Sequence, residues 1–238
     1  MIKIGLALGG GGARGLAHIG VLKVLQRENI PISCIVGCSI GAMIGAAFSL
    51  FQDAQKIEAL AFEWIESRLF EEMGIEIFAE QDKDDKNHRL DDFITYMKIR
   101  FSFLKALNNP AIFERETIEP FFNIFNGVHI EKLPVRFAAI ATDLISGEEV
   151  VLKKGDLKTA LMASSAIPGI FPPVALGKRL LVDGATSDSV PVHVIRQRGA
   201  KKVIAVDVTK CIRKIGPLSN ALYILYRSDE IATYHLPT

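Results

Sequence analysis

A serine between two glycines stands near the start of the chain, in residues 37–41 (Gly-Cys-Ser-Ile-Gly). An apolar run precedes it in residues 32–36, and a helix-forming run follows in residues 42–48. A sharp strand-to-helix turn crowds its apical residue, and flanking glycines relieve that crowding. Such a turn exposes the serine hydroxyl at the top of a sheet, beside a helix N-terminus. Ser39 is therefore the candidate nucleophile, although the five-residue pattern alone also arises by chance.

A glycine-rich loop precedes this turn, because residues 9–15 read Gly-Gly-Gly-Gly-Ala-Arg-Gly. The loop formally fits the dinucleotide fingerprint, but no acidic residue follows the second apolar run to bind a ribose. A phosphate-binding P-loop would need Gly-Lys-Ser/Thr, which is also missing. The remaining chemical use is an oxyanion hole, in which the backbone N–H groups of Gly10, Gly11 and Gly12 point at a developing negative charge. A simple tight turn is the structural alternative.

A serine hydroxyl needs a base to act as a nucleophile at neutral pH. Of the five histidines, His193 and His235 come late enough for the order Ser, acid, His that many hydrolases show. Asp183 is the better candidate, because it ends an apolar run and precedes a glycine. Burial would raise its proton affinity, and a direct hydrogen bond to the serine would supply proximity. The alternative for Asp183 is a turn or capping aspartate.

The segments that would position these residues alternate between strand and helix patterns. Residues 2–8 and 32–36 are apolar enough for buried strands, and residues 16–27 carry the wide apolar stripe of a helix packed on a sheet. This order is typical of a parallel sheet. Further strands are expected at 135–143, 149–152, 178–182 and 203–208, and further helices at 53–70, 117–125, 157–164 and 191–198.

The length of 238 residues predicts one main domain over residues 1–210. Residues 53–109 are expected to form a helical insertion or cap, and residues 211–238 a C-terminal helical segment that stops abruptly, as a truncated one would. Within the insertion, residues 93–104 place apolar side chains on one helical face. That face could enter lipid headgroups, but packing on the core is the commoner arrangement.

Composition limits the classes of partner and compartment. A formal net charge of +1 argues against a nucleic-acid partner, and three cysteines without metal-ligand spacing or a disulfide framework predict a reduced, cytoplasmic protein. No signal peptide is expected, because the first residues run into glycines before an apolar region can form. Residues 29–52 carry no charge and are long enough to span a membrane. Pro31 and the β-like first half favour a buried strand followed by a buried helix.

Together, residues 10–15, 37–41, 163–168 (Ala-Ser-Ser-Ala-Ile-Pro) and 183–185 (Asp-Gly-Ala) resemble the bacterial branch of the patatin-like phospholipase family. The resemblance covers residues 4–198. It implies an α/β fold, a three-layer α/β/α sandwich with a mostly parallel central sheet. It also implies a Ser–Asp dyad without histidine that hydrolyses acyl esters of lipids through an acyl-enzyme, without a metal or other cofactor.

Carried over by position, the resemblance makes Ser39 the nucleophile and Asp183 the base. The N–H groups of Gly10 to Gly12 would form the oxyanion hole, and Arg14 matches a basic position that steadies the loop or contacts an anionic headgroup. Many members of the family have an Asn-Pro pair after the aspartate. Here residues 186–191 read Thr-Ser-Asp-Ser-Val-Pro, which leaves the loop contacts and the substrate preference open.

We therefore expect a serine acyl-ester hydrolase whose partner is a lipid or acyl-ester substrate, with peripheral membrane contact as a further point to test. An acyltransferase or thioesterase would use the same chemistry with another acceptor or another activated acyl group. A module that binds a nucleotide or phosphate at the glycine loop, without turnover, is the alternative from another class.

Overall fold

The computed structural model describes residues 3–67 and 110–209, together with positions 224, 227, 228, 231 and 232. Residues 68–109, which make up most of the expected insertion and include the amphipathic face at 93–104, lie outside the described residues. The same holds for nearly all of the expected C-terminal segment at 211–238, including His235.

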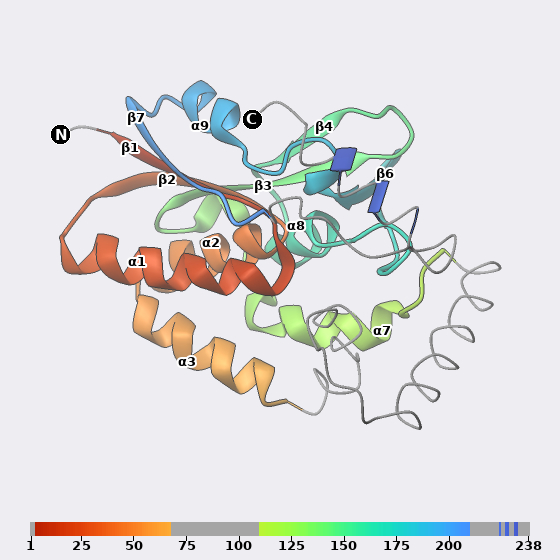
Figure 1. The fold of residues 1–238 in the computed structure, drawn as a ribbon, viewed down its shortest axis with the longest axis horizontal. Helices are drawn as coiled ribbons and strands as arrows, with labels where there is room; N and C mark the ends of the chain where they lie inside the picture. The colour runs from red at the N-terminus through yellow and green to blue at the C-terminus, as the bar shows by residue number, and fades with distance from the viewer. Residues whose placement is uncertain (1–2, 68–109, 210–223, 225–226, 229–230, 233–238) are drawn as a thin grey trace.

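The described residues form a seven-stranded sheet with helices on both faces (Figure 1). The strand order is β5-β6-β3-β2-β1-β7, and β4 pairs with β3 outside this path. The strands are β1 (Ile4–Leu8), β2 (Ile32–Cys38), β3 (Arg136–Asp143), β4 (Glu149–Leu152), β5 (Val174–Leu176), β6 (Arg179–Asp183) and β7 (Lys202–Val206). The expected α/β fold with a central sheet is confirmed.

The helices begin and end close to the expected positions, with one exception. They are α1 (Ala17–Arg27), α2 (Ile40–Phe51), α3 (Ala54–Ile65), α7 (Arg115–Ile118), α8 (Leu157–Ser164) and α9 (Val192–Gln197), with 3-10 turns η1 (Gly12–Leu16), η2 (Glu119–Phe125), η3 (Ile130–Lys132) and η4 (Gly184–Thr186). The helix expected at 117–125 is instead one short α-helical turn followed by η2. Pro120 lies at the start of η2, where its missing N–H costs no hydrogen bond.

Strand direction divides the sheet into two halves. Parallel pairings join β7, β1, β2 and β3. Antiparallel pairings join β3 to β4, β3 to β6, and β6 to β5. The sheet is therefore parallel in the half that contains the N-terminal strand and antiparallel in the other, so the expectation of a mostly parallel sheet holds for the first half only.

Strands β2 and β6 meet end to end along one side of β3. Cys38 at the end of β2 lies opposite Ile140, and Asp183 at the end of β6 lies opposite Ala141. Strand β4 pairs with β3 over the same stretch and so occupies its other side, because a strand has only two neighbouring positions. Since β2 runs parallel and β6 antiparallel to β3, their carboxyl ends face each other at this junction.

Side chains of the central strands alternate between two hydrophobic cores. Leu8, Ile35 and Phe137 pack in the larger core with residues of α1, α2 and α8, whereas Val36 and Ala138 pack in the smaller core with α9. This period of two is the pattern of a sheet that is covered on both faces. Figure 1 accordingly shows α9 on one side of the sheet and α1, α2 and α8 on the other.

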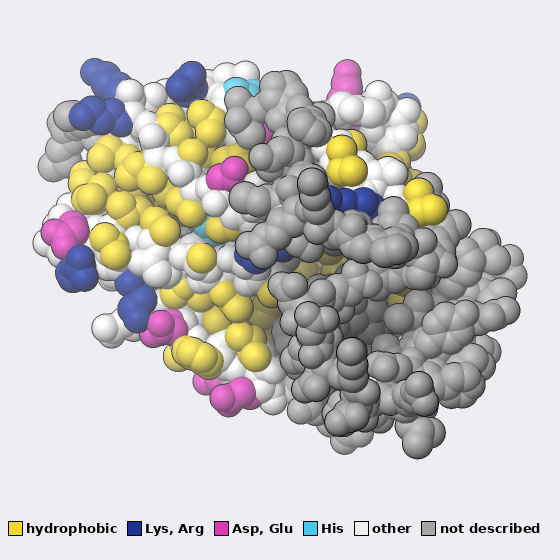
Figure 2. All heavy atoms as spheres, viewed as in Figure 1, with side chains coloured by type: hydrophobic (Ala, Val, Ile, Leu, Met, Phe, Trp, Pro, Cys, Tyr) yellow, Lys and Arg dark blue, Asp and Glu magenta, His cyan; other side chains and the backbone are white. Residues whose placement is uncertain are grey.

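The uncharged stretch at 29–52 forms strand β2, the Ser39 turn and helix α2. Among the described residues, no helix has the length and apolar character needed to cross a membrane. On the face that carries α1 and α3, Figure 2 shows hydrophobic side chains with acidic and basic ones mixed among them. Phe62 of α3 is the most exposed large hydrophobic residue of these two helices, at 58%.

Candidate active site

Ser39 occupies the turn between β2 and α2. Its backbone has φ 54° and ψ −126°, a conformation that is costly for a residue other than glycine. Space for the turn depends on its glycines. A Cβ added to Gly41 would meet the carbonyl oxygen of Leu8, and one added to Gly37 would meet the carbonyl oxygen of Gly41. The two flanking glycines therefore let the turn and the start of α2 approach the neighbouring backbone.

The structure brings Ser39 and Asp183 together at the junction of β2 and β6. The Ser39 hydroxyl donates a hydrogen bond of 2.6 Å to Oδ2 of Asp183, and both residues are buried. The other carboxylate oxygen, Oδ1, accepts the N–H of Ala185 at 2.9 Å and the thiol of Cys38 at 3.6 Å. One oxygen of Asp183 thus faces the serine, and the other is held by its surroundings. This geometry would let the carboxylate accept the proton of the hydroxyl.

Cys38 lies beside the same carboxylate but has a different character. Burial, reinforced by the negative charge of Asp183, raises the pKa of the Cys38 thiol well above its usual value. The thiolate is the reactive form of cysteine. Cys38 therefore stays protonated and serves as a hydrogen-bond donor, which leaves the Ser39 hydroxyl as the candidate nucleophile.

The end of α8 and the residues that follow it hold both members of the pair, a role that residue types alone did not reveal. The Ser39 N–H donates to the hydroxyl of Ser164 at 3.0 Å, and the Asp183 N–H donates to the carbonyl of Ala166 at 2.9 Å. Both contacts come from residues 163–168, which the resemblance marked as a motif without a role. That motif was the available sequence signal.

The glycine loop lies directly against the serine. A Cβ added to Gly10 would lie 3.5 Å from the Cβ of Ser39. The N–H of Gly10 donates to the carbonyl of Ser189 at 2.9 Å, so the expectation that this N–H points into an oxyanion hole is corrected. Within the described part of the chain, the N–H groups of Gly11 and Gly12 have no hydrogen-bond acceptor. These two groups are the ones available to an anion.

Two side chains tie the glycine loop to its neighbours. Arg14 donates from Nε to the carbonyl of Val208 at 2.9 Å, past the end of β7. His18, fully buried in α1, donates from Nε2 to the carbonyl of Gly9 at 2.8 Å. Burial lowers the pKa of His18, so its ring is neutral at pH 7. His18 therefore supports the loop as a neutral hydrogen-bond donor.

His193, the other histidine considered as a base, lies beside two carboxylates. Its ring nitrogens lie 3.2 Å from Glu149 and 3.2 Å from Asp188. Asp188 also accepts the N–H of Val190, and the intervening Ser189 carbonyl holds the glycine loop. Ligand atoms of Glu149, Asp188 and His193 lie within 4.8 Å of one another, a spacing that could admit a cation. Asp188 and Ser189 connect this cluster to the glycine loop.

Comparison with known proteins supports the sequence resemblance. The profile of the patatin-like phospholipase family matches residues 6–196. An uncharacterized NTE family protein of Mycobacterium tuberculosis is 32% identical over 87% of this chain, which spans 30% of that relative. Lysophospholipase NTE1 of Cryptococcus neoformans is 30% identical over 87% of the chain, which spans 11% of it.

Among solved structures, VipD from Legionella pneumophila aligns with 77% of this chain and 45% of its own, at 16% identity and a TM-score of 0.44. The family profile covers most of the chain, from β1 to α9, and includes the serine turn, the glycine loop and the aspartate. The chain belongs to the patatin-like phospholipase family.

Proposed function

We propose that the chain is a serine acyl-ester hydrolase that acts on lipids, as a phospholipase A or a related lipid acyl hydrolase. The observation that carries the proposal is the 2.6 Å hydrogen bond from the Ser39 hydroxyl to Asp183. Membership of the family and the relative named a lysophospholipase support the class of reaction and of substrate. Because the chain spans only part of these relatives, the proposal concerns this domain.

In the proposed reaction, the Ser39 oxygen attacks the ester carbonyl while Asp183 accepts the hydroxyl proton. The tetrahedral intermediate collapses, and Asp183 returns the proton to the leaving alcohol. A water molecule then attacks the acyl-enzyme, gives its proton to Asp183, and releases the fatty acid as Ser39 regains a proton. The direct contact between hydroxyl and carboxylate supplies the proximity that a weak base such as aspartate needs.

The negative charge of the intermediate would be stabilised by backbone N–H groups near Ser39. Gly11 and Gly12 offer N–H groups, and Ile40, the first residue of α2, offers a third because the first N–H groups of a helix have no partner within it. In this family of turns, the residue after the nucleophile is a usual donor. Arg14 lies on the same loop, is exposed, and is the candidate contact for an anionic headgroup.

The test is the loss of hydrolysis and of covalent labelling in Ser39→Ala. We expect the wild-type protein to cleave short-chain nitrophenyl esters and to react with a fluorophosphonate at Ser39, as located by peptide mapping. Ser49→Ala is the matched control, because Ser49 is a buried serine of α2 whose hydroxyl donates to the Gly45 carbonyl of the same helix. Wild-type rates in Ser39→Ala would end the proposal.

Product analysis decides between hydrolysis and transfer. Free fatty acid should dominate with water alone, and an added alcohol or lysolipid should not divert most of the product if the protein is a hydrolase. Efficient transfer to the added acceptor would assign the acyltransferase alternative. Rates on monomeric and on aggregated lipid then measure whether the protein acts at a membrane surface. Protection by a nucleotide against heat, without fluorophosphonate labelling, would instead indicate the binding module.

A further inference from the structure

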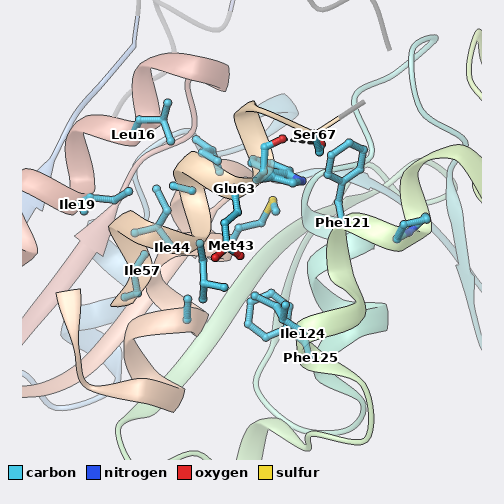
Figure 3. A pocket seen from close by; sticks show the side chains of 16 residues that line it. Leu16, Ile19, Met43, Ile44, Ile57, Glu63, Ser67, Phe121, Ile124 and Phe125 are labelled. Carbon is cyan, nitrogen blue, oxygen red and sulfur yellow. Dashed lines mark hydrogen bonds between the residues drawn. The ribbon is translucent and has the colours of Figure 1, made fainter. Parts of the chain in front are cut away.

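A polar cluster lies on the face of the sheet that α9 covers, whereas the apolar cavity lined by α1, α2, α3 and η2 lies on the other face (Figure 3). The cluster consists of Glu149 of β4, Asp188 of the segment after η4, and His193 of α9. Val150 packs in the larger core and Val151 against the smaller one, so Glu149, which alternates with Val150, shares the α9 face. Three separate segments of the chain therefore bring ligand-type side chains to one place.

One carboxylate oxygen of Asp188 is buried without a hydrogen bond. Asp188 is 8% exposed, and its Oδ1 accepts the N–H of Val190 at 3.0 Å. Its Oδ2 faces the cluster, because Nδ1 of His193 lies 3.2 Å away, yet it accepts no hydrogen bond from any described residue. A buried polar atom without a partner costs free energy, and it is a sign that a water molecule or an ion belongs at that position.

The charges of the cluster point to an ion. Among the described residues, His193 is the only basic side chain that pairs with either Glu149 or Asp188. A neutral imidazole carries one N–H and one lone pair, so it cannot compensate two carboxylates. Two negative groups close together in a partly buried site repel each other unless a positive charge joins them.

The ligand atoms are of the type and spacing that zinc uses. Zinc binds imidazole nitrogen and carboxylate oxygen at about 2.0–2.2 Å, so two ligands of one tetrahedral ion lie roughly 3.4 Å apart. Nδ1 of His193 and Oδ2 of Asp188 are 3.2 Å apart, and one ligand atom from each of the three side chains lies within 4.8 Å of the others. The His193 side chain is 54% exposed, which leaves room for water as a further ligand.

We propose that Glu149, Asp188 and His193 bind a divalent transition-metal ion, with Zn²⁺ the best fit to one nitrogen and two oxygen ligands. The inference does not depend on the proposed function, because the ion would take no part in the ester chemistry of the candidate catalytic pair. Its effect would be structural, since it would join β4, the segment after η4 and α9, which are far apart along the chain.

The glycine loop is the part of the site that such an ion would steady. The carbonyl of Ser189, the residue after Asp188, accepts the N–H of Gly10 at 2.9 Å. An ion that fixes Asp188 would hold this carbonyl in place and would keep the Gly10 hydrogen bond closed. Metal binding should therefore slow exchange of the Gly10 amide hydrogen, which requires that bond to open.

Equilibrium dialysis against Zn²⁺ tests the site directly, after a chelator has removed bound metal. Ca²⁺ and Mg²⁺ should bind more weakly than Zn²⁺, because they prefer sites made of oxygen ligands only. His193→Gln and Glu149→Gln should each weaken Zn²⁺ binding at least tenfold, since each removes a direct ligand. Both side chains are partly exposed, so we expect both variants to fold. Circular dichroism checks this.

His129→Gln is the matched control. His129 is a half-exposed histidine that also lies beside a glutamate, 3.8 Å from Glu131, but no group of three ligand-type side chains among the described residues includes it. Its Zn²⁺ affinity should equal that of the wild-type protein. Hydrogen–deuterium exchange of the peptide that contains Gly10 should slow on Zn²⁺ addition in the wild-type protein and in His129→Gln, and this slowing should be lost in His193→Gln.

The outcomes separate this inference from the proposed function, because none of these measurements requires ester hydrolysis. The site is overturned if the wild-type protein binds no Zn²⁺, in which case the cluster is a protonated histidine between two carboxylates. Equal Zn²⁺ affinity in the wild-type protein, His193→Gln and Glu149→Gln would place the ion elsewhere, for example on cysteine thiols. Zn²⁺ binding at the three side chains with unchanged Gly10 exchange would refute the link to the glycine loop.

Discussion

The parallel and the antiparallel halves of the sheet position the two candidate catalytic groups in different ways. In the parallel half, β1, η1, α1, β2 and α2 follow one another in the sequence, and this continuous stretch carries both the glycine loop and Ser39. In the antiparallel half, Asp183 reaches the site only because β6 pairs with β3 at the point where β2 ends. Local sequence shapes the serine turn, whereas long-range strand pairing decides where the carboxylate lies.

The largest expected effect comes from removing a group of the pair from either half. Asp183→Asn should lower kcat/KM for a short-chain ester by roughly 10²–10⁴-fold, the usual contribution of a positioned base. Because Ser39 and Asp183 would act as one unit, the double variant with Ser39→Ala should be no slower than Ser39→Ala alone. Steady-state kinetics of the three variants measures this.

Asp53→Asn is the control for the loss of an aspartate, because Asp53 caps α3 and asparagine caps a helix equally well. Its activity should equal that of the wild-type protein. If the kcat/KM of the double variant fell by the product of the two single losses, Ser39 and Asp183 would act independently despite their contact.

Close backbone packing should make the halves equally sensitive to a single added methyl group. A Cβ on Gly41 would meet the carbonyl oxygen of Leu8 in the parallel half, and one on Gly184 would lie 2.5 Å from the carbonyl oxygen of Ile140 at the junction. Backbone atoms cannot rotate away, so Gly41→Ala and Gly184→Ala should each lower the free energy of unfolding by about 1–3 kcal/mol. Urea denaturation measures this change.

Gly20 provides the matched control, because it lies in α1 and a Cβ there would meet nothing within 4 Å. Gly20→Ala should raise the free energy of unfolding by about 0.5–1 kcal/mol through helix propensity. If Gly184→Ala were as stable as the wild-type protein, the two strand ends would not be packed as closely as the parallel half.

The smallest expected effects concern the change of folding stability with pH. A buried histidine of the parallel half and a partly buried glutamate of the antiparallel half should change stability in opposite directions as pH rises. Burial lowers the pKa of His18 below 6.5, so the unfolded chain binds a proton more readily, and the stability that His18 contributes is lost as pH falls below 6.5. Burial raises the pKa of Glu149 above 4.5, so the folded chain holds that proton more tightly. The contribution of Glu149 is therefore present at low pH and is lost as pH rises above 4.5.

Unfolding free energies of the wild-type protein, His18→Gln and Glu149→Gln between pH 4 and 8 test this difference. The unfolding free energy of the wild-type protein minus that of His18→Gln should rise with pH. The unfolding free energy of the wild-type protein minus that of Glu149→Gln should fall with pH. Slopes of the same sign in both comparisons would contradict the assignment of the two burial effects.

The sequence predicted the parallel half better than the antiparallel half. Apolar periodicity gave β1, α1, β2 and α2 and the serine turn, because each is set by neighbouring residues. The run at 178–182 predicted a strand but not its direction, since direction depends on which strand it pairs with. The engaged N–H of Gly10 and the contact from Ser164 to Ser39 likewise depend on residues far along the chain.

The separation of Ser39 and Asp183 along the chain has a consequence for biosynthesis. They lie 144 residues apart. A ribosome that adds about 5–20 residues per second needs roughly 7–29 seconds to reach the aspartate after it has incorporated the serine. During that interval the nascent polypeptide carries the Ser39 hydroxyl without the Asp183 carboxylate, so the proposed pair cannot form until translation has passed Asp183.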